Sequence, residues 1–181
     1  MQTQLTVIYP TEIQAVSSFF YTIKIIKMKS ILFFAAICFF SISSNAQDAT
    51  GLRKKHFNLD GSIAINGYDA VAYFTQNKAV KGKKDVAVYH QGITYYFSSV
   101  TNKELFKANP SKYEPEYGGW CAYAMGEKGE KVSIDAETFK IVNGKLYLFY
   151  NRFFNNTLKD WNKNETALKK NADANWPKLY H

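Results

Sequence analysis

The segment TFKIVNGKLYLFY, Thr138–Tyr150, carries alternating apolar residues on both sides of Asn143-Gly144. Asn-Gly suits the two positive φ angles of a tight hairpin turn, so this segment predicts two antiparallel strands. A second segment, VAVYHQGITYYF at Val86–Phe97, places β-branched and aromatic runs around Gln91-Gly92 and predicts another hairpin. Together the two hairpins indicate a small antiparallel sheet.

Helices are predicted between and after these hairpins. Ser98-Ser99 can cap a helix that must stop at Asn109-Pro110, because proline disfavours helical geometry in the residue before it. Residues 111–115 are expected to form a linker. The segment EYGGWCAYAMG, Glu116–Gly126, then predicts a short helix, entered through its paired glycines and left at Gly126.

The C-terminal segment Asn156–Asn175 predicts an amphipathic helix that ends before Pro177. Its apolar residues fall at helical spacing: Leu158, Trp161, Leu168, Ala172 and Trp176. The order of strands, helices, strands and helix indicates an α+β fold, with a small antiparallel sheet built from hairpins and packed against several helices. We expect this domain to span residues 62–181, starting with apolar runs around Asn66-Gly67, after an irregular lead-in at residues 47–61.

The chain from Met28 has the pattern of a secretory signal peptide. Lys29 precedes the apolar run Ile31–Phe40, and Ser44-Asn45-Ala46 offers a cleavage site, which predicts a signal peptide at residues 28–46. The run is shorter than the roughly 20 residues of a membrane-spanning helix, so no stable membrane anchor is expected after cleavage. The protein is therefore predicted to be exported, to a periplasm or the extracellular space. Residues 1–27 are interpreted as a non-native upstream extension.

Charge and motif content exclude several classes of function. The formal net charge is +8, and removal of residues 1–46 would take away three lysines and one glutamate. The remaining lysines are scattered, so nucleic acid is not an expected partner. The chain has no phosphate-binding glycine loop, HExxH or GxSxG motif, and Asp69, Asp135 and Glu137 are read as solvated or capping carboxylates. A hydrolase or nucleotide enzyme is not indicated, and we expect a protein that is not an enzyme.

Five segments together resemble an exported YHS-domain protein. They cover nearly all of the chain after the signal peptide: GYDAVAYF (67–74), ITYYFSS (93–99), FKANPSKYEPEYGGWCAYA (106–124), KIVNGKLYLFYN (140–151) and ADANWPKL (172–179). The resemblance implies a small α+β domain and a metal-related setting, because YHS modules occur attached to heavy-metal transporting ATPases. The group also includes members named as possible selenoproteins, and a selenocysteine of theirs at the position of Cys121 would favour redox chemistry. Short YHS modules often carry a cysteine pair that this chain lacks, so a closed structural zinc site is not supported.

Cys121 is the cysteine that remains after cleavage, because Cys38 would leave with the signal peptide. Near a helix N-terminus, unpaired N–H groups and the helix dipole favour a thiolate. Met125 lies four residues later, so on a helix the two sulfurs would share a face, and such soft ligands prefer Cu(I). With His90 as the third ligand, these residues predict a binding module for a soft metal such as copper.

Three other interpretations of Cys121 stay open on the sequence alone. The cysteine can serve as the reactive thiolate of a thiol-redox protein that an external thiol resolves. The chain can be a non-catalytic interaction domain that recognises another exported protein through its aromatic surface. Cys121 and Met125 can also be core residues, with His90 an ordinary surface histidine, because free cysteine is among the most buried residue types.

Overall fold

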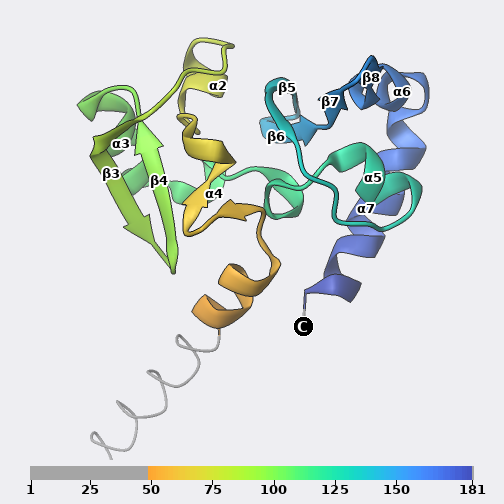
Figure 1. Cartoon of the computed structure of the whole chain (residues 1–181), viewed down its shortest axis with the longest axis horizontal. Coiled ribbons are helices and arrows are strands. Elements are labelled where there is room, and N and C mark those ends of the chain that lie inside the picture. The colour runs from red at the N-terminus through yellow and green to blue at the C-terminus, as the bar shows by residue number, and fades with distance from the viewer. Residues whose placement is uncertain (1–48, 181) are drawn as a thin grey trace, which may run out of the picture. The chain divides into compact units, whose positions relative to one another are not determined.

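The computed structural model describes residues 49–180, which lie within one compact unit, Asp48–His181 (Figure 1). The predicted signal peptide and the upstream extension lie outside the described residues. None of the helices within residues 49–180 combines the length and apolar character needed to cross a bilayer. The described part has the predicted α+β fold.

The largest sheet has four strands in the order β1-β2-β4-β3. Their bounds are β1 Leu59–Asp60, β2 Ile63–Ala64, β3 Lys83–His90 and β4 Ile93–Phe97. The β3–β4 hairpin turns at Gln91-Gly92, as predicted. However, β2 pairs with β4 in parallel, so the sheet is mixed, whereas the sequence predicted antiparallel pairing from hairpins alone. β2 and β4 can run in the same direction because a short 3₁₀ helix, an α-helix and β3 separate them along the chain.

The hairpin predicted at Thr138–Tyr150 is confirmed as strands β5, Asp135–Val142, and β6, Lys145–Phe149. Asn143 and Gly144 adopt φ angles of 51° and 73°, as a tight turn requires. A third hairpin follows at once, formed by β7, Asn151–Arg152, and β8, Asn155–Asn156. Its turn residues are two phenylalanines, which are not residues that favour a tight turn, so the sequence did not predict this hairpin.

The helices follow the predicted order with changed bounds. They are η1 Ile65–Gly67, α2 Ala72–Thr75, α3 Val100–Ala108, α4 Pro110–Tyr113, η2 Glu116–Gly119, α5 Ala122–Glu127, α6 Thr157–Lys163 and α7 Glu165–Leu179. Ser99 caps α3, since its side chain accepts a hydrogen bond from the Asn102 N–H at 3.2 Å. The expected linker at residues 111–115 instead begins within α4, which the Asn109 side chain caps.

Two further segments differ from their predicted form. The C-terminal helix is broken at Asn164, whose ψ of 46° interrupts the helix, and α7 continues through Pro177 to Leu179. Residues 49–56, expected to be irregular, form a helix. A long-range ion pair between the Arg53 guanidinium and the Glu114 carboxylate holds that helix. The same guanidinium lies 4.4 Å from the centre of the ring of Phe57, which follows the helix.

Strand β6 connects two hydrophobic clusters. Leu146 and Leu148 belong to the first, which also takes in β4, α3 and Cys121, whereas Tyr147 and Phe149 belong to the second. The second cluster contains Met125, Trp161, Leu168 and Ala172 from α5, α6 and α7. Because successive side chains of a strand point to opposite faces, both faces of β6 are buried, and this accounts for its continuous apolar run. Figure 1 shows β3, β4 and α3 on one side and α5, α6 and α7 on the other.

Buried tyrosines should make the fold sensitive to alkali. Burial raises the pKa of Tyr73, Tyr95 and Tyr117 above the usual value of about 10, helped by the Glu114 charge beside Tyr95 and by the Tyr117–Asp173 hydrogen bond. A pKa raised in the folded state stabilises the fold below pH 10 and ceases to do so as pH rises further. Absorbance at 295 nm should therefore show exposed tyrosines ionising first and these three only as circular dichroism reports unfolding. A single ionisation step with the fold intact would contradict this burial.

Candidate functional site

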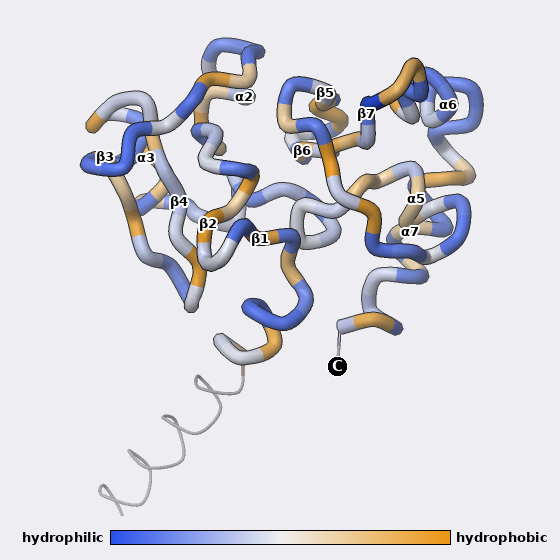
Figure 2. The backbone as a smooth tube through the Cα atoms, viewed as in Figure 1, coloured by the Kyte–Doolittle hydropathy of each residue, from blue (hydrophilic) through white to orange (hydrophobic). Residues whose placement is uncertain are grey.

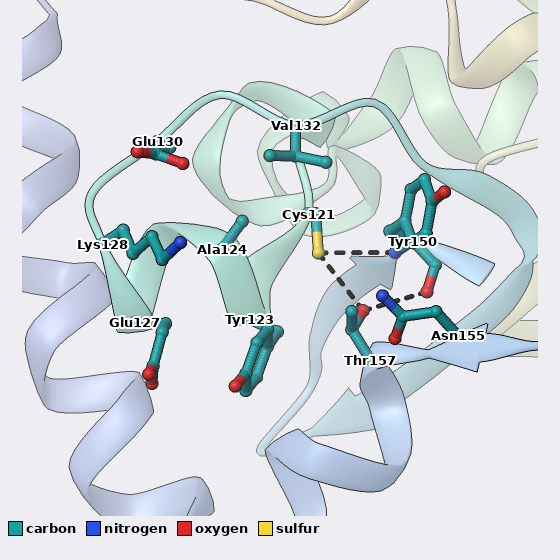
Figure 3. Close-up of a pocket in the computed structure, with 10 residues that line it drawn as sticks. All are labelled: Cys121, Tyr123, Ala124, Glu127, Lys128, Glu130, Val132, Tyr150, Asn155 and Thr157. Carbon is teal, nitrogen blue, oxygen red and sulfur yellow. Dashed lines mark hydrogen bonds between the residues drawn. The ribbon is translucent and has the colours of Figure 1, made fainter. Parts of the chain in front are cut away.

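A pocket of about 300 Å³ opens beside α5 and has Cys121 among its lining residues (Figure 3). Its walls come from three parts of the chain: residues 121–132, Tyr150 at the end of β6, and residues 155–157 at the start of α6. Segments far apart in the sequence therefore meet at one site.

The backbone of Cys121 is fixed on both sides. Its N–H donates to the Val132 carbonyl at 2.9 Å, and its own carbonyl accepts the Met125 N–H at 3.0 Å, which starts α5. A parallel bridge also places Cys121 beside Leu148 of β6. The chain reaches this position through η2, where Gly118 and Gly119 have φ angles of 61° and 81°, so the predicted entry through paired glycines is confirmed.

The sulfur of Cys121 is enclosed by hydrogen-bonding groups. Its residue is 0% exposed. The Tyr150 N–H donates to Sγ at 3.3 Å, and the Thr157 hydroxyl lies 3.4 Å from Sγ. Because that hydroxyl donates its hydrogen to the Tyr150 carbonyl at 2.9 Å, the thiol must be the donor to Thr157. The dashed lines of Figure 3 trace this closed ring, which suits a protonated thiol.

The rest of the pocket combines apolar walls with a charged mouth. Ala124 and Val132 are half-buried, and the ring of Tyr123 stands beside them in Figure 3. The side chains of Glu127 and Lys128 are exposed at the rim. Such a site offers apolar contact along its walls and polar contact at both ends.

Met125 and His90, the other predicted metal ligands, line no part of this pocket. Cys121 precedes α5 with a non-helical ψ of 115°, so the rule that residues four apart share a helix face does not apply to the pair. Met125 is instead fully buried in the second hydrophobic cluster with Trp161. His90 ends β3, with its ring 6.0 Å from the ring of Phe106. Within residues 49–180, no three His, Cys, Asp or Glu side chains are grouped to hold a metal ion.

Sequence reasoning missed Tyr150, Asn155 and Thr157 as site residues. Thr157 lies 36 residues from Cys121 and Tyr150 lies 29 residues away, so no local pattern joins them to the cysteine. The one available signal is the run Asn155-Asn156-Thr157, which is typical of a helix start and places a hydroxyl at the first position of α6.

Comparison of the chain with family models, with curated proteins and with solved structures found no match. The YHS resemblance therefore stays a prediction.

Proposed function

We propose that this domain is a non-catalytic binding module whose ligand occupies the Cys121 pocket. The observation that carries the proposal is the position of Cys121: this fully buried residue is among those that line a pocket of about 300 Å³ with apolar walls and a charged rim. That volume lies at the lower end of the range for small-molecule sites. The export and the YHS-like character of the domain are proposed with it, on the sequence features of residues 28–46 and of the five matching segments.

The hydrogen bonds around the sulfur favour binding over catalysis. Among residues 49–180, the polar contacts of Sγ are with the Tyr150 N–H and the Thr157 hydroxyl, and no acidic or imidazole side chain is bonded to it. A nucleophilic cysteine needs a base or a positive neighbour that lowers the energy of the thiolate. The proposed ligand is a small molecule with an apolar body, packed against Val132 and Tyr123, and a polar group at the Cys121 end.

A soft metal such as copper is retained as a second ligand to be tested, because Cys121 is among the residues that line the pocket. The donor set does not fit a complete copper site, since the pocket supplies one sulfur and neither Met125 nor His90 lines it. Copper bound there would need further ligands from another molecule. The thiol-redox alternative also uses Cys121. It requires a reactive thiolate, whereas the binding proposal requires none.

Filling the pocket tests the proposal. Ala124→Phe would place a ring in the pocket, whereas Ala174→Phe adds the same ring at an exposed position of α7 and serves as the matched control. Calorimetric titration with small aromatic and aliphatic carboxylates and amines should find a ligand that the unmodified chain and Ala174→Phe bind alike. Ala124→Phe should bind it at least about tenfold more weakly, since a buried ligand cannot share the space.

The outcome against the proposal is equal affinity in Ala124→Phe and Ala174→Phe, since the ligand would then bind elsewhere. A parallel titration with Cu(I) under a competing chelator decides the metal: uptake that Cys121→Ser abolishes assigns copper to this site. Unchanged uptake in Cys121→Ser removes copper from it.

A further inference from the structure

The turn of the β7–β8 hairpin carries two phenylalanines whose side chains are almost fully exposed. Phe153 is 90% exposed and Phe154 is 110% exposed, the highest values among the exposed large apolar residues of the described part. Figure 2 shows this turn as a hydrophobic loop next to hydrophilic segments near α6. The fold gains no core packing from either ring.

The backbone of the same turn is strained. Phe153 and Phe154 have φ angles of 50° and 65°, in the left-handed region that side chains with a Cβ disfavour. The chain satisfies the same demand at Asn143-Gly144 with residues suited to it. Phe153 and Phe154 combine a strained backbone with exposed rings, which points to a role other than stabilising the fold.

We propose that this turn is a membrane-contact site, in which both rings enter the interfacial region of an anionic phospholipid bilayer. The proposal does not depend on the function proposed for the Cys121 pocket. Transfer of exposed aromatic side chains out of water is favourable, and the interfacial region of a bilayer accepts them without a complementary pocket.

The charges near the turn favour an anionic lipid surface. Arg152 adjoins the two rings, and Lys159 lies in α6, the helix that follows β8 directly. Both are exposed, and neither forms an ion pair within residues 49–180. Cations beside inserted aromatic rings would meet phospholipid phosphate groups, with an attraction that salt screens.

A protein partner fits the turn less well. A stable protein interface buries about 800 Å² on each side around an apolar core. Here the apolar surface is limited to two adjacent rings, and their neighbours are polar: Asn151, Arg152, Asn155 and Asn156. A narrow projection of this kind suits a fluid surface.

The test replaces the turn with residues that its geometry prefers. In the full chain, Phe153→Asn with Phe154→Gly removes both rings and relieves both positive φ angles, so the variant should unfold at the same or a higher temperature. Co-sedimentation with vesicles of phosphatidylcholine and phosphatidylglycerol should show the partition coefficient falling at least about tenfold relative to the unmodified chain. Residues 1–48 are the same in both chains, so the difference reports the turn.

A local probe completes the test. Phe154→Trp should be quenched by brominated lipid in these vesicles, whereas Tyr89→Trp, at a 66% exposed position on β3, should not. Equal quenching at both positions, or a double variant that partitions like the unmodified chain, would overturn the proposal. It would also be overturned if the unmodified chain self-associates through the turn in sedimentation velocity and position 154 stays unquenched, because a second copy would then cover the rings.

Discussion

Replacing Asp69 with alanine should lower the free energy of unfolding by about 3–5 kcal/mol. The Asp69 side chain is fully buried and accepts five hydrogen bonds. Three come from backbone N–H groups, those of Val71 at 2.9 Å, Ala72 at 3.2 Å and Ser98 at 2.8 Å. The Ser98 hydroxyl donates at 2.6 Å and the Asn102 amide at 2.7 Å. Alanine would leave these donors buried without an acceptor, and the start of α2 would lose its tie to β4 and α3.

The matched control is Asp135→Ala. The Asp135 carboxylate also accepts from a backbone N–H, that of Glu137 at 3.1 Å, and from the Thr138 hydroxyl at 2.9 Å, but it lies near the surface. Water can replace it there, so the loss should be about 1 kcal/mol. Urea unfolding followed by tryptophan fluorescence measures both variants. A loss for Asp69→Ala no greater than that for Asp135→Ala would show that the buried network does not stabilise the fold.

Replacing Gly126 with alanine should cost about 2–4 kcal/mol, although alanine is the better helix former. A Cβ at this position of α5 would lie 2.4 Å from the carbonyl oxygen and 2.9 Å from the carbonyl carbon of Leu168 in α7. Both atoms are backbone, so the helices would have to move apart, which would also disturb the packing of Met125 and Ala172 in the second cluster.

Gly51→Ala separates this steric effect from helix propensity. Gly51 lies in the helix over residues 49–56, and a Cβ there would meet no atom of residues 49–180 within 4 Å. Its replacement should stabilise the protein by up to about 1 kcal/mol. Thermal unfolding should therefore shift down for Gly126→Ala and stay level or rise for Gly51→Ala. A fall of similar size in both variants would argue against close packing of α5 on α7.

The local signals in the sequence were sufficient for the hairpins and for one helix cap. Asn143-Gly144, Gln91-Gly92 and Ser99 each act through their own backbone geometry, and each has its predicted role. The sequence did not reveal two features, one that depends on a distant contact and one whose residues carry no turn signal. The helix over residues 49–56 is held by Glu114, and the turn at Phe153-Phe154 contradicts the usual turn residues.

The candidate site was predictable in part, for the same reason. The glycine-rich approach to Cys121 follows from the local sequence and is present, whereas the predicted helix over Glu116–Gly126 is divided into η2 and α5, with Cys121 outside both. The neighbours of the sulfur do not follow from it, because Tyr150 and Thr157 reach it through the fold of β6 and α6. The pairing with Met125 assumed that Cys121 is itself helical, but its backbone is not.

The central claim is that the pocket beside α5 ends at Cys121, whose residue is 0% exposed, so that local movement of the pocket walls is enough to expose the sulfur. Its most direct test is the rate of thiol modification in the folded protein. With Cys38 replaced by serine, we expect methyl methanethiosulfonate to modify Cys121 much faster than the protein unfolds. Ala124→Phe should slow that reaction at least about tenfold without destabilising the fold. A modification rate equal to the rate of global unfolding, and the same in Ala124→Phe, would contradict the claim and leave Cys121 as a sealed core residue.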